Sequence, residues 1–75
     1  MNYRKTKFYK NLTDTIDASE YAQGMGLGET ATITERLIAW QWLVDRGVIL
    51  QWGGWFVEEA EFLIAKGLIQ GGETK

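Results

Sequence analysis

The chain has 75 residues, enough for one small domain, and carries a formal net charge of −2 at pH 7. It contains no cysteine and no histidine, which excludes disulfides and thiolate metal sites and removes the commonest zinc ligand and general base. The remaining source of stability for so small a domain is its aromatic content, with four tryptophans, three tyrosines and three phenylalanines. Large rings bury much apolar area per residue.

No apolar run approaches the roughly 20 residues that a membrane span requires. No apolar signal core follows the basic N-terminus. These patterns predict a soluble intracellular protein with no membrane partner, and the absence of cysteine fits a reducing compartment.

Charge is distributed unevenly along the chain. The first ten residues contain no acid and four bases, namely Arg4, Lys5, Lys7 and Lys10. The remaining 65 residues contain four basic and ten acidic residues, a net charge of −6. An acidic body of this kind repels phosphate rather than attracting it.

Residues 1–14 are polar and basic with scattered aromatic rings, and we predict an extended or partly disordered arm. Two interpretations remain open. The arm is either a basic recruiting tail or a solvated end whose aromatic side chains pack onto the body.

Residues 15–70 form a single predicted helical domain, with a first helix from Ala18 to about Gln23. The segment Asp17-Ala18-Ser19-Glu20 has the form of a capping box, which satisfies backbone N–H groups at a helix start. Glycines 24, 26 and 28 should end this helix in a turn held by Met25 and Leu27. Their spacing matches neither phosphate-binding nor dinucleotide-binding loops.

A second helix is predicted from Ile33 to about Arg46, with a capping box at Thr32–Glu35 and a left-handed glycine cap at Gly47. Helical periodicity gives it a core stripe of Ile33, Leu37, Trp40 and Val44, and a second apolar stripe of Ile38 and Trp42. A helix with two apolar stripes either sits between two neighbours or presents one stripe to a partner.

A third helix is predicted from about Trp55 to Lys66, stopped by Gly67. One face carries the core residues Phe56, Ala60, Leu63 and Ile64. Trp55 and Phe62 share a second face, which Glu58 and Glu59 flank.

The second and third helices are each followed by a short, apolar, β-prone connector, Val48–Trp52 and Leu68–Gln70, and these two runs could pair as a small sheet. Residues 71–75 are a polar tail. The predicted fold class is therefore mainly α, a small three-helix domain with two connectors and a basic N-terminal arm.

The segments Thr34-Glu35-Arg36-Leu37, Ala39-Trp40-Gln41 and Gly54-Trp55-Phe56 stand at the centre of a longer pattern that runs from about Tyr21 to Ile69. This pattern resembles a family of short uncharacterised proteins from tailed phages. The resemblance implies a phage origin and a location in the host bacterial cytoplasm, but no activity and no functional residues. The family pattern is more basic or neutral at Glu58 and Glu59.

The composition argues against catalysis and against a metal or cofactor site. Glu58, Glu59 and Glu61 are the carboxylates that could form a paired or metal-binding site. Glu58 and Glu61 are three residues apart and could share a side of the helix, but adjacent acids on a helix point apart. A solvated acidic face explains them better than a buried catalytic pair.

A helix-turn-helix-like nucleic-acid regulator is one alternative. Its recognition helix would carry three glutamates, whereas such helices normally carry groups that bind phosphates and base edges. The candidate nucleic-acid residues are Arg4, Lys5, Lys7 and Lys10, and four charges give weak, salt-sensitive binding.

Protein binding is the preferred interpretation, because aromatic rings bordered by acids are typical of interface centres. The candidate partner-binding residues are Trp42, Trp52, Trp55, Phe62, Glu58 and Glu59. With the phage resemblance, the expected partner is a host protein that the chain modulates or inhibits. Alternatively, the rings complete the core or join two copies, as in a structural or dimeric accessory protein.

Overall fold

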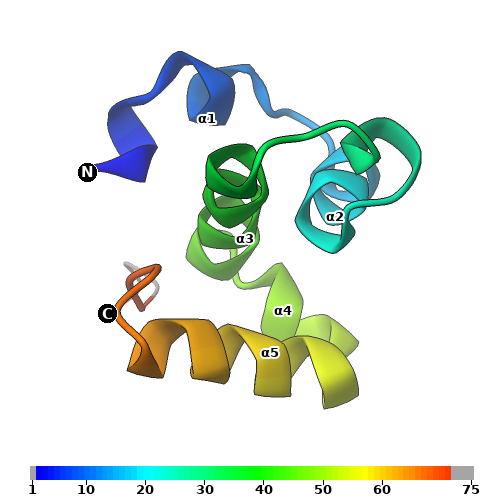
Figure 1. Ribbon diagram of the computed structural model, residues 1–75. Coiled ribbons are helices and arrows are strands. Elements are labelled where there is room, and N and C mark those ends of the chain that lie inside the picture. Colours follow the sequence, from blue (N-terminus) through cyan, green and yellow to red (C-terminus); the bar gives the residue numbers. More distant parts are fainter. Residues whose placement is uncertain (1, 72–75) are drawn as a thin grey trace.

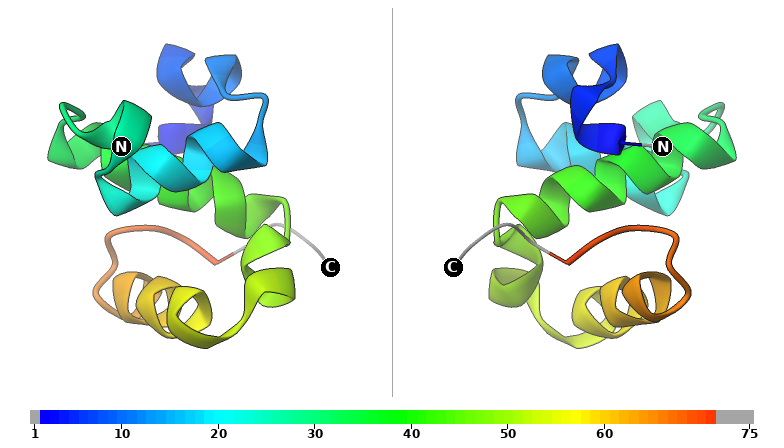
Figure 2. Two further views of the ribbon diagram at one scale, coloured as in Figure 1. Left: turned by 90° about the vertical axis from the view of Figure 1, so that its right-hand side faces the viewer. Right: turned by 90° about the vertical axis from the view of Figure 1, so that its left-hand side faces the viewer.

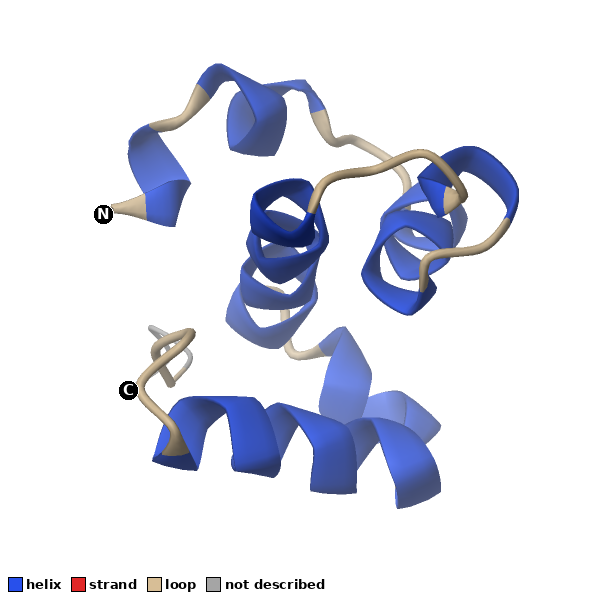
Figure 3. Ribbon diagram, viewed as in Figure 1, coloured by secondary structure: helices blue, strands red, loops and turns tan. Residues whose placement is uncertain are grey.

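The computed structural model describes residues 2–71, which form helices and no strand (Figures 1 and 3). In chain order the elements are η1 (Tyr3–Lys5), α1 (Lys7–Asn11), α2 (Thr15–Gln23), η2 (Gly26–Gly28), α3 (Ile33–Asp45), α4 (Val48–Trp52) and α5 (Gly54–Ala65). The prediction of a mainly α fold is confirmed, although the described residues form more helices than the three predicted. Of the predicted polar tail, residues 72–75 lie outside the described residues.

Helix α3 is the centre of the fold, with α1 above it, α2 beside it and α5 below it in Figure 1. Six successive α3 residues from Ile38 to Leu43 are buried. The helix therefore lies between neighbours, one of the two arrangements that its double apolar stripe allowed. The predicted core stripe was wrong at its first residue, because Ile33 is 69% exposed.

The extended N-terminal arm is also a wrong prediction, since this segment forms η1 and α1. The side chains of Asn2 and Thr6 cap the two short helices, accepting hydrogen bonds from the backbone N–H groups of Arg4 and Tyr9. Such caps satisfy donors that a helix start leaves open. Tyr3, Phe8 and Tyr9 pack against the core, as the second interpretation of this segment expected.

Helix α2 begins earlier than predicted, because Asp14 rather than Asp17 is its N-cap. The Asp14 carboxylate accepts hydrogen bonds from the backbone N–H groups of Ile16 and Asp17. Gly24 then ends the helix in the left-handed conformation, with φ of +72°. The sequence predicted this helix end from the glycine.

The turn after α2 is not held by Met25 and Leu27, which are 54% and 51% exposed. Instead, the backbone N–H of Leu27 donates a 2.9 Å hydrogen bond to Oε1 of Glu20. Gly28 is buried against the backbone of α2. The carboxylate of Glu20 and the close backbone packing at Gly28 therefore fix this turn.

The two connectors are not strands, and the predicted sheet between them is wrong. Residues 48–52 form α4, which buries Ile49 and leaves Leu50 77% exposed. Left-handed Gly47 (φ +73°), as predicted, and Gly53 (φ +63°) turn the chain at either end. Tertiary packing therefore overrides the β propensity of this short apolar run.

The ends of the longer helices follow the predicted signals. Thr32 and Glu35 form the capping box of α3. After α5, Gly67 adopts φ of +76°, and the N–H of Leu68 donates a 3.0 Å hydrogen bond to the carbonyl of Leu63. The chain then runs back between α5 and α3 (Figure 2) and buries Ile69.

We predict that Gly28→Ala destabilises the fold by about 1–3 kcal/mol, the usual cost of overpacking. An added Cβ would lie 2.2 Å from the carbonyl oxygen of Glu20 and 2.5 Å from Cα of Tyr21. Gly71→Ala is the matched control, because its Cβ would meet nothing within 4 Å. Urea unfolding measures both variants, and equal stabilities would contradict the proposed contact.

Candidate functional site

Four aromatic rings pack together where α3, α4 and α5 meet. The ring centroid of Trp40 lies 5.9 Å from that of Trp55 and 6.0 Å from that of Phe56. Trp52 and Trp55 lie 4.8 and 5.1 Å from Phe56. The indole N–H of buried Trp40 also donates a 3.1 Å hydrogen bond to the carbonyl of Ala22. The ring cluster therefore ties α2 to the other three helices.

The outer part of this cluster is open to solvent. Trp52 is 39% exposed, and Trp55 on α5 is 54% exposed. Phe62, which is 53% exposed, lies two helical turns after Trp55 and so on the same side of α5.

Glu58 and Glu59 flank the two rings, and we call Trp55, Glu58, Glu59 and Phe62 the α5 face. Glu58 is exposed and Glu59 is half-buried. The ammonium group of Lys66 lies 5.5 Å from the ring centroid of Phe62, within reach of a cation–π contact. Four of the six predicted partner-binding residues thus lie together on one helix.

Trp42 does not belong to this surface, so its assignment to a partner-binding site is wrong. It is 2% exposed and part of the core, because α3 is covered on the side where Trp42 was expected to face a partner. The guanidinium carbon of Arg46 lies 4.2 Å from the Trp42 ring centroid. The indole nitrogen of Trp42 is buried, and it is the one such side-chain nitrogen or oxygen within residues 2–71 that has no hydrogen-bond partner.

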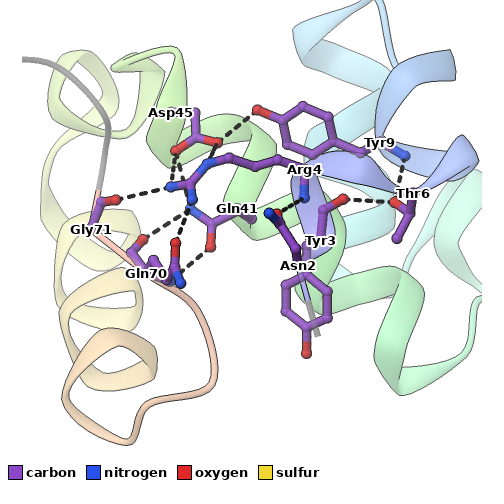
Figure 4. Close-up of polar contacts among 9 residues, drawn as sticks. All are labelled: Asn2, Tyr3, Arg4, Thr6, Tyr9, Gln41, Asp45, Gln70 and Gly71. Atoms are coloured by element: carbon purple, nitrogen blue, oxygen red, sulfur yellow. Dashed lines mark hydrogen bonds and ion pairs between the residues drawn. The ribbon is translucent and has the colours of Figure 1, made fainter.

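A second candidate site is the polar network around Asp45, at the end of α3 (Figure 4). Arg4 holds this carboxylate with two hydrogen bonds, from Nε to Oδ2 at 2.7 Å and from Nη2 to Oδ1 at 2.8 Å. The Tyr9 hydroxyl donates to Oδ2 at 2.6 Å, and Nε2 of Gln41 donates to Oδ1 at 3.1 Å. A paired charge with this many donors is well satisfied inside a protein.

The same network reaches the C-terminal segment. The amide of Gln41, which is 1% exposed, donates to the carbonyl of Gln70 at 2.9 Å and accepts from its N–H at 2.7 Å. Arg4 also donates to the side chain of Gln70 and to the carbonyl of Gly71. We call Arg4, Tyr9, Gln41, Asp45 and Gln70 the terminal clasp, because it joins both ends of the described chain to α3.

The clasp changes the role of the basic N-terminus. Arg4, predicted as a candidate nucleic-acid residue, is engaged with Asp45 and with the C-terminal segment. Lys5, Lys7 and Lys10 remain exposed. Gln41 and Asp45 were not predicted as site residues. They lie four residues apart on one helix, and nothing in the sequence indicates that their partners come from both ends of the described chain.

The electrostatics of the clasp fit a structural role. Burial alone would raise the pKa of Asp45, but the hydrogen bonds from Arg4 and Tyr9 outweigh it and hold this pKa below its usual value. Burial, and then the hydrogen bond to Asp45, raise the pKa of Tyr9 to about 12. Asp45 is therefore ionised and Tyr9 protonated at neutral pH, and neither is poised to exchange a proton.

Three further findings concern metal sites, membrane-spanning helices and similarity to known proteins. Within residues 2–71, no three carboxylates gather to form a site for a metal ion. No helix in this part of the chain is long and apolar enough to cross a bilayer. Comparison with protein-family models, with curated proteins and with solved structures found no match.

We predict that Asp45→Asn lowers stability at pH 7 by about 1.5–3 kcal/mol, the usual worth of hydrogen bonds to a charged group. The pKa of Asp45 is depressed in the fold, so its contribution is present above the ordinary carboxyl pKa of 3.8 and is lost as the pH falls further. Urea unfolding between about pH 2 and 7 should show the two proteins converging in acid. A constant difference across this range would contradict the role of the ionised carboxylate.

We also predict opposite behaviour for two tryptophans. Trp42→Ala should destabilise the fold by about 3–5 kcal/mol, as expected when a large buried side chain is removed. Trp55→Ala should lower the free energy of unfolding much less, because Trp55 is already about half exposed to water. Thermal unfolding followed by circular dichroism measures both, and equal losses would mean that Trp55 is a core residue.

Proposed function

We propose that the protein acts without catalysis, by binding another protein through the α5 face. The observation that carries this proposal is the pair of rings Trp55 and Phe62, each more than half exposed on the same side of one helix. Contiguous apolar surface on a small protein marks interaction sites. Aromatic rings at the centre with acids at the edge fit the usual anatomy of an interface.

The support beneath the α5 face also favours binding. Trp55 rests on Phe56 and on buried Trp40, at the distances given above. A ring held in place by packing loses little freedom when a partner covers it, so less free energy is spent on ordering the interface.

The residue types present in the chain favour binding to a partner over catalysis. It has no histidine or cysteine, and Glu59 and Glu61 line hollows on different sides of α5. We infer that the protein alters its partner by covering a surface. The resemblance to short tailed-phage proteins directs this proposal to a protein of the host bacterium, whose activity would be modulated or inhibited in the cytoplasm.

The two alternatives have less support. A nucleic-acid regulator would have to use Lys5, Lys7 and Lys10, because Arg4 is engaged in the clasp, while α5 presents glutamates. A structural or dimeric accessory protein would use the same α5 face, so the size of the purified protein in solution is measured alongside the binding test.

The test is affinity capture from host lysate with the native chain and the double variant Trp55→Ala/Phe62→Ala. We expect the native chain to enrich a defined protein and the variant to lose it while keeping the native circular dichroism spectrum. Ile16→Ala, an exposed apolar change on α2, is the matched control and should retain the partner. Unchanged capture by the double variant would refute the proposal.

A further inference from the structure

Residues 68–71, which we call the C-terminal strap, follow α5 without forming a helix or a strand. Ile69 is the one buried residue of the strap, and its neighbours on both sides are exposed. The strap begins after Gly67, which has φ of +76° and open space around its Cβ position. Contacts with other elements, rather than regular structure of its own, therefore hold the strap in place.

These contacts come from α3 and from the opposite end of the chain. Gln41 on α3 pairs with both backbone groups of Gln70, at 2.9 and 2.7 Å. Arg4 on η1 donates to the Gln70 side chain and, at 3.1 Å, to the carbonyl of Gly71 (Figure 4). Tyr3, Arg4 and Gln41 also line a hollow of about 220 Å³ together with the strap. The N-terminal segment is therefore one of the elements that position the strap.

The N-terminal segment, residues 3–11, has equally few anchors of its own. Neither η1 nor α1 contains a buried residue. Within the described chain, its hydrogen bonds to other elements come from Arg4 and Tyr9, and all of them end in the terminal clasp. The ring of Phe8 adds an aromatic contact with Tyr21 on α2, at 5.0 Å between centroids. The clasp is therefore the polar attachment of this segment as well.

The two chain ends share the same bonding groups. The guanidinium of Arg4 bonds to Asp45 and to the strap at the same time. Nε2 of Gln41 likewise donates both to Asp45 and to the carbonyl of Gln70. If either end leaves, groups at the other end lose hydrogen-bond partners, which costs free energy. Release of one end therefore weakens the attachment of the other.

We propose that the terminal clasp is a latch, in which the strap and the N-terminal segment detach from α3 together while α3 and α5 stay folded. Proteins open in cooperative parts, at a lower free energy than global unfolding. Opening of the latch exposes the amide of Gln41 and the site that Ile69 occupies. Linkage is reciprocal, so a molecule that holds or displaces one end acts equally on the other end. The α5 face takes no part in this device.

Amide hydrogen exchange of the native chain, followed by NMR, tests the latch. The N–H of Gln70 reports the strap, because it bonds to Gln41. The N–H of Lys10, bonded to the carbonyl of Thr6 at 3.2 Å, reports α1. The N–H of Leu43, inside α3, reports global unfolding. We expect one opening equilibrium for Gln70 and Lys10, and much slower exchange at Leu43.

Conservative variants at each end test whether the effect crosses to the other. Ile69→Val should speed exchange at Gln70 by about two- to tenfold, as expected for one buried methyl group, and at Lys10 by the same factor. Phe8→Leu, which removes the ring contact with Tyr21, should also speed exchange at both amides. Leu50→Ala is the control and should affect neither amide, since Leu50 is 77% exposed on α4.

A further variant tests the role of Arg4. Arg4→Lys keeps the charge but loses the planar fork that reaches several acceptors at once. In this background, Ile69→Val should still speed exchange at Gln70 but no longer at Lys10. The four proteins form a double-mutant cycle that isolates the coupling. Lys5→Gln, an exposed change on the same η1 helix, is the matched control and should leave the coupling intact.

Three results would overturn the latch. In the first, each variant speeds exchange only at its own end. In the second, Gln70 and Lys10 exchange as slowly as Leu43, so that the ends detach only when the whole chain unfolds. In the third, the coupling persists unchanged in Arg4→Lys. Capture of a partner through Trp55 and Phe62 is a separate measurement, and none of these results alters it.

Discussion

The buried ring of Trp40 connects the three longest helices of the described chain. Its indole N–H donates a hydrogen bond to the carbonyl of Ala22 on α2, and its ring packs against Trp55 and Phe56 on α5. Small domains have little interior to share among their elements, so one large ring that serves three helices substitutes for a deeper core. The same shortage of interior space leaves Trp55 at the surface, because Trp55 packs against a ring cluster whose inner side is already filled.

The parts of the fold that sequence analysis predicted depend on short-range signals. The capping box of Thr32 and Glu35 and the left-handed glycines 47 and 67 each act over a few residues, and the structure has them where expected. The exposed placement of Trp55 and Phe62 is also local, since it follows from the register of a single helix. Most of the candidate site could therefore be placed before the fold was known.

The predictions that were wrong concern segments whose burial or conformation depends on the neighbouring elements that cover them. Trp42 lies off the first apolar stripe of α3, and only the neighbouring helices decide whether a second stripe is buried. The N-terminal segment has weak helical signals of its own, but packing of Tyr3 and Phe8 and the bond from Arg4 to Asp45 hold it. Residues 48–52 have β-prone side chains, yet they form a helical turn because the burial of Ile49 decides their conformation.

The terminal clasp also constrains when the fold can be completed. It joins positions 4, 45 and 70, so nearly the whole chain has to be available before these bonds exist. During synthesis, Asp45 and Gln41 are made long before Gln70 can reach them, and α3 meanwhile lacks one of its covers. Contacts between such distant positions slow folding relative to local ones, and the clasp is therefore expected to form after the helices that it joins.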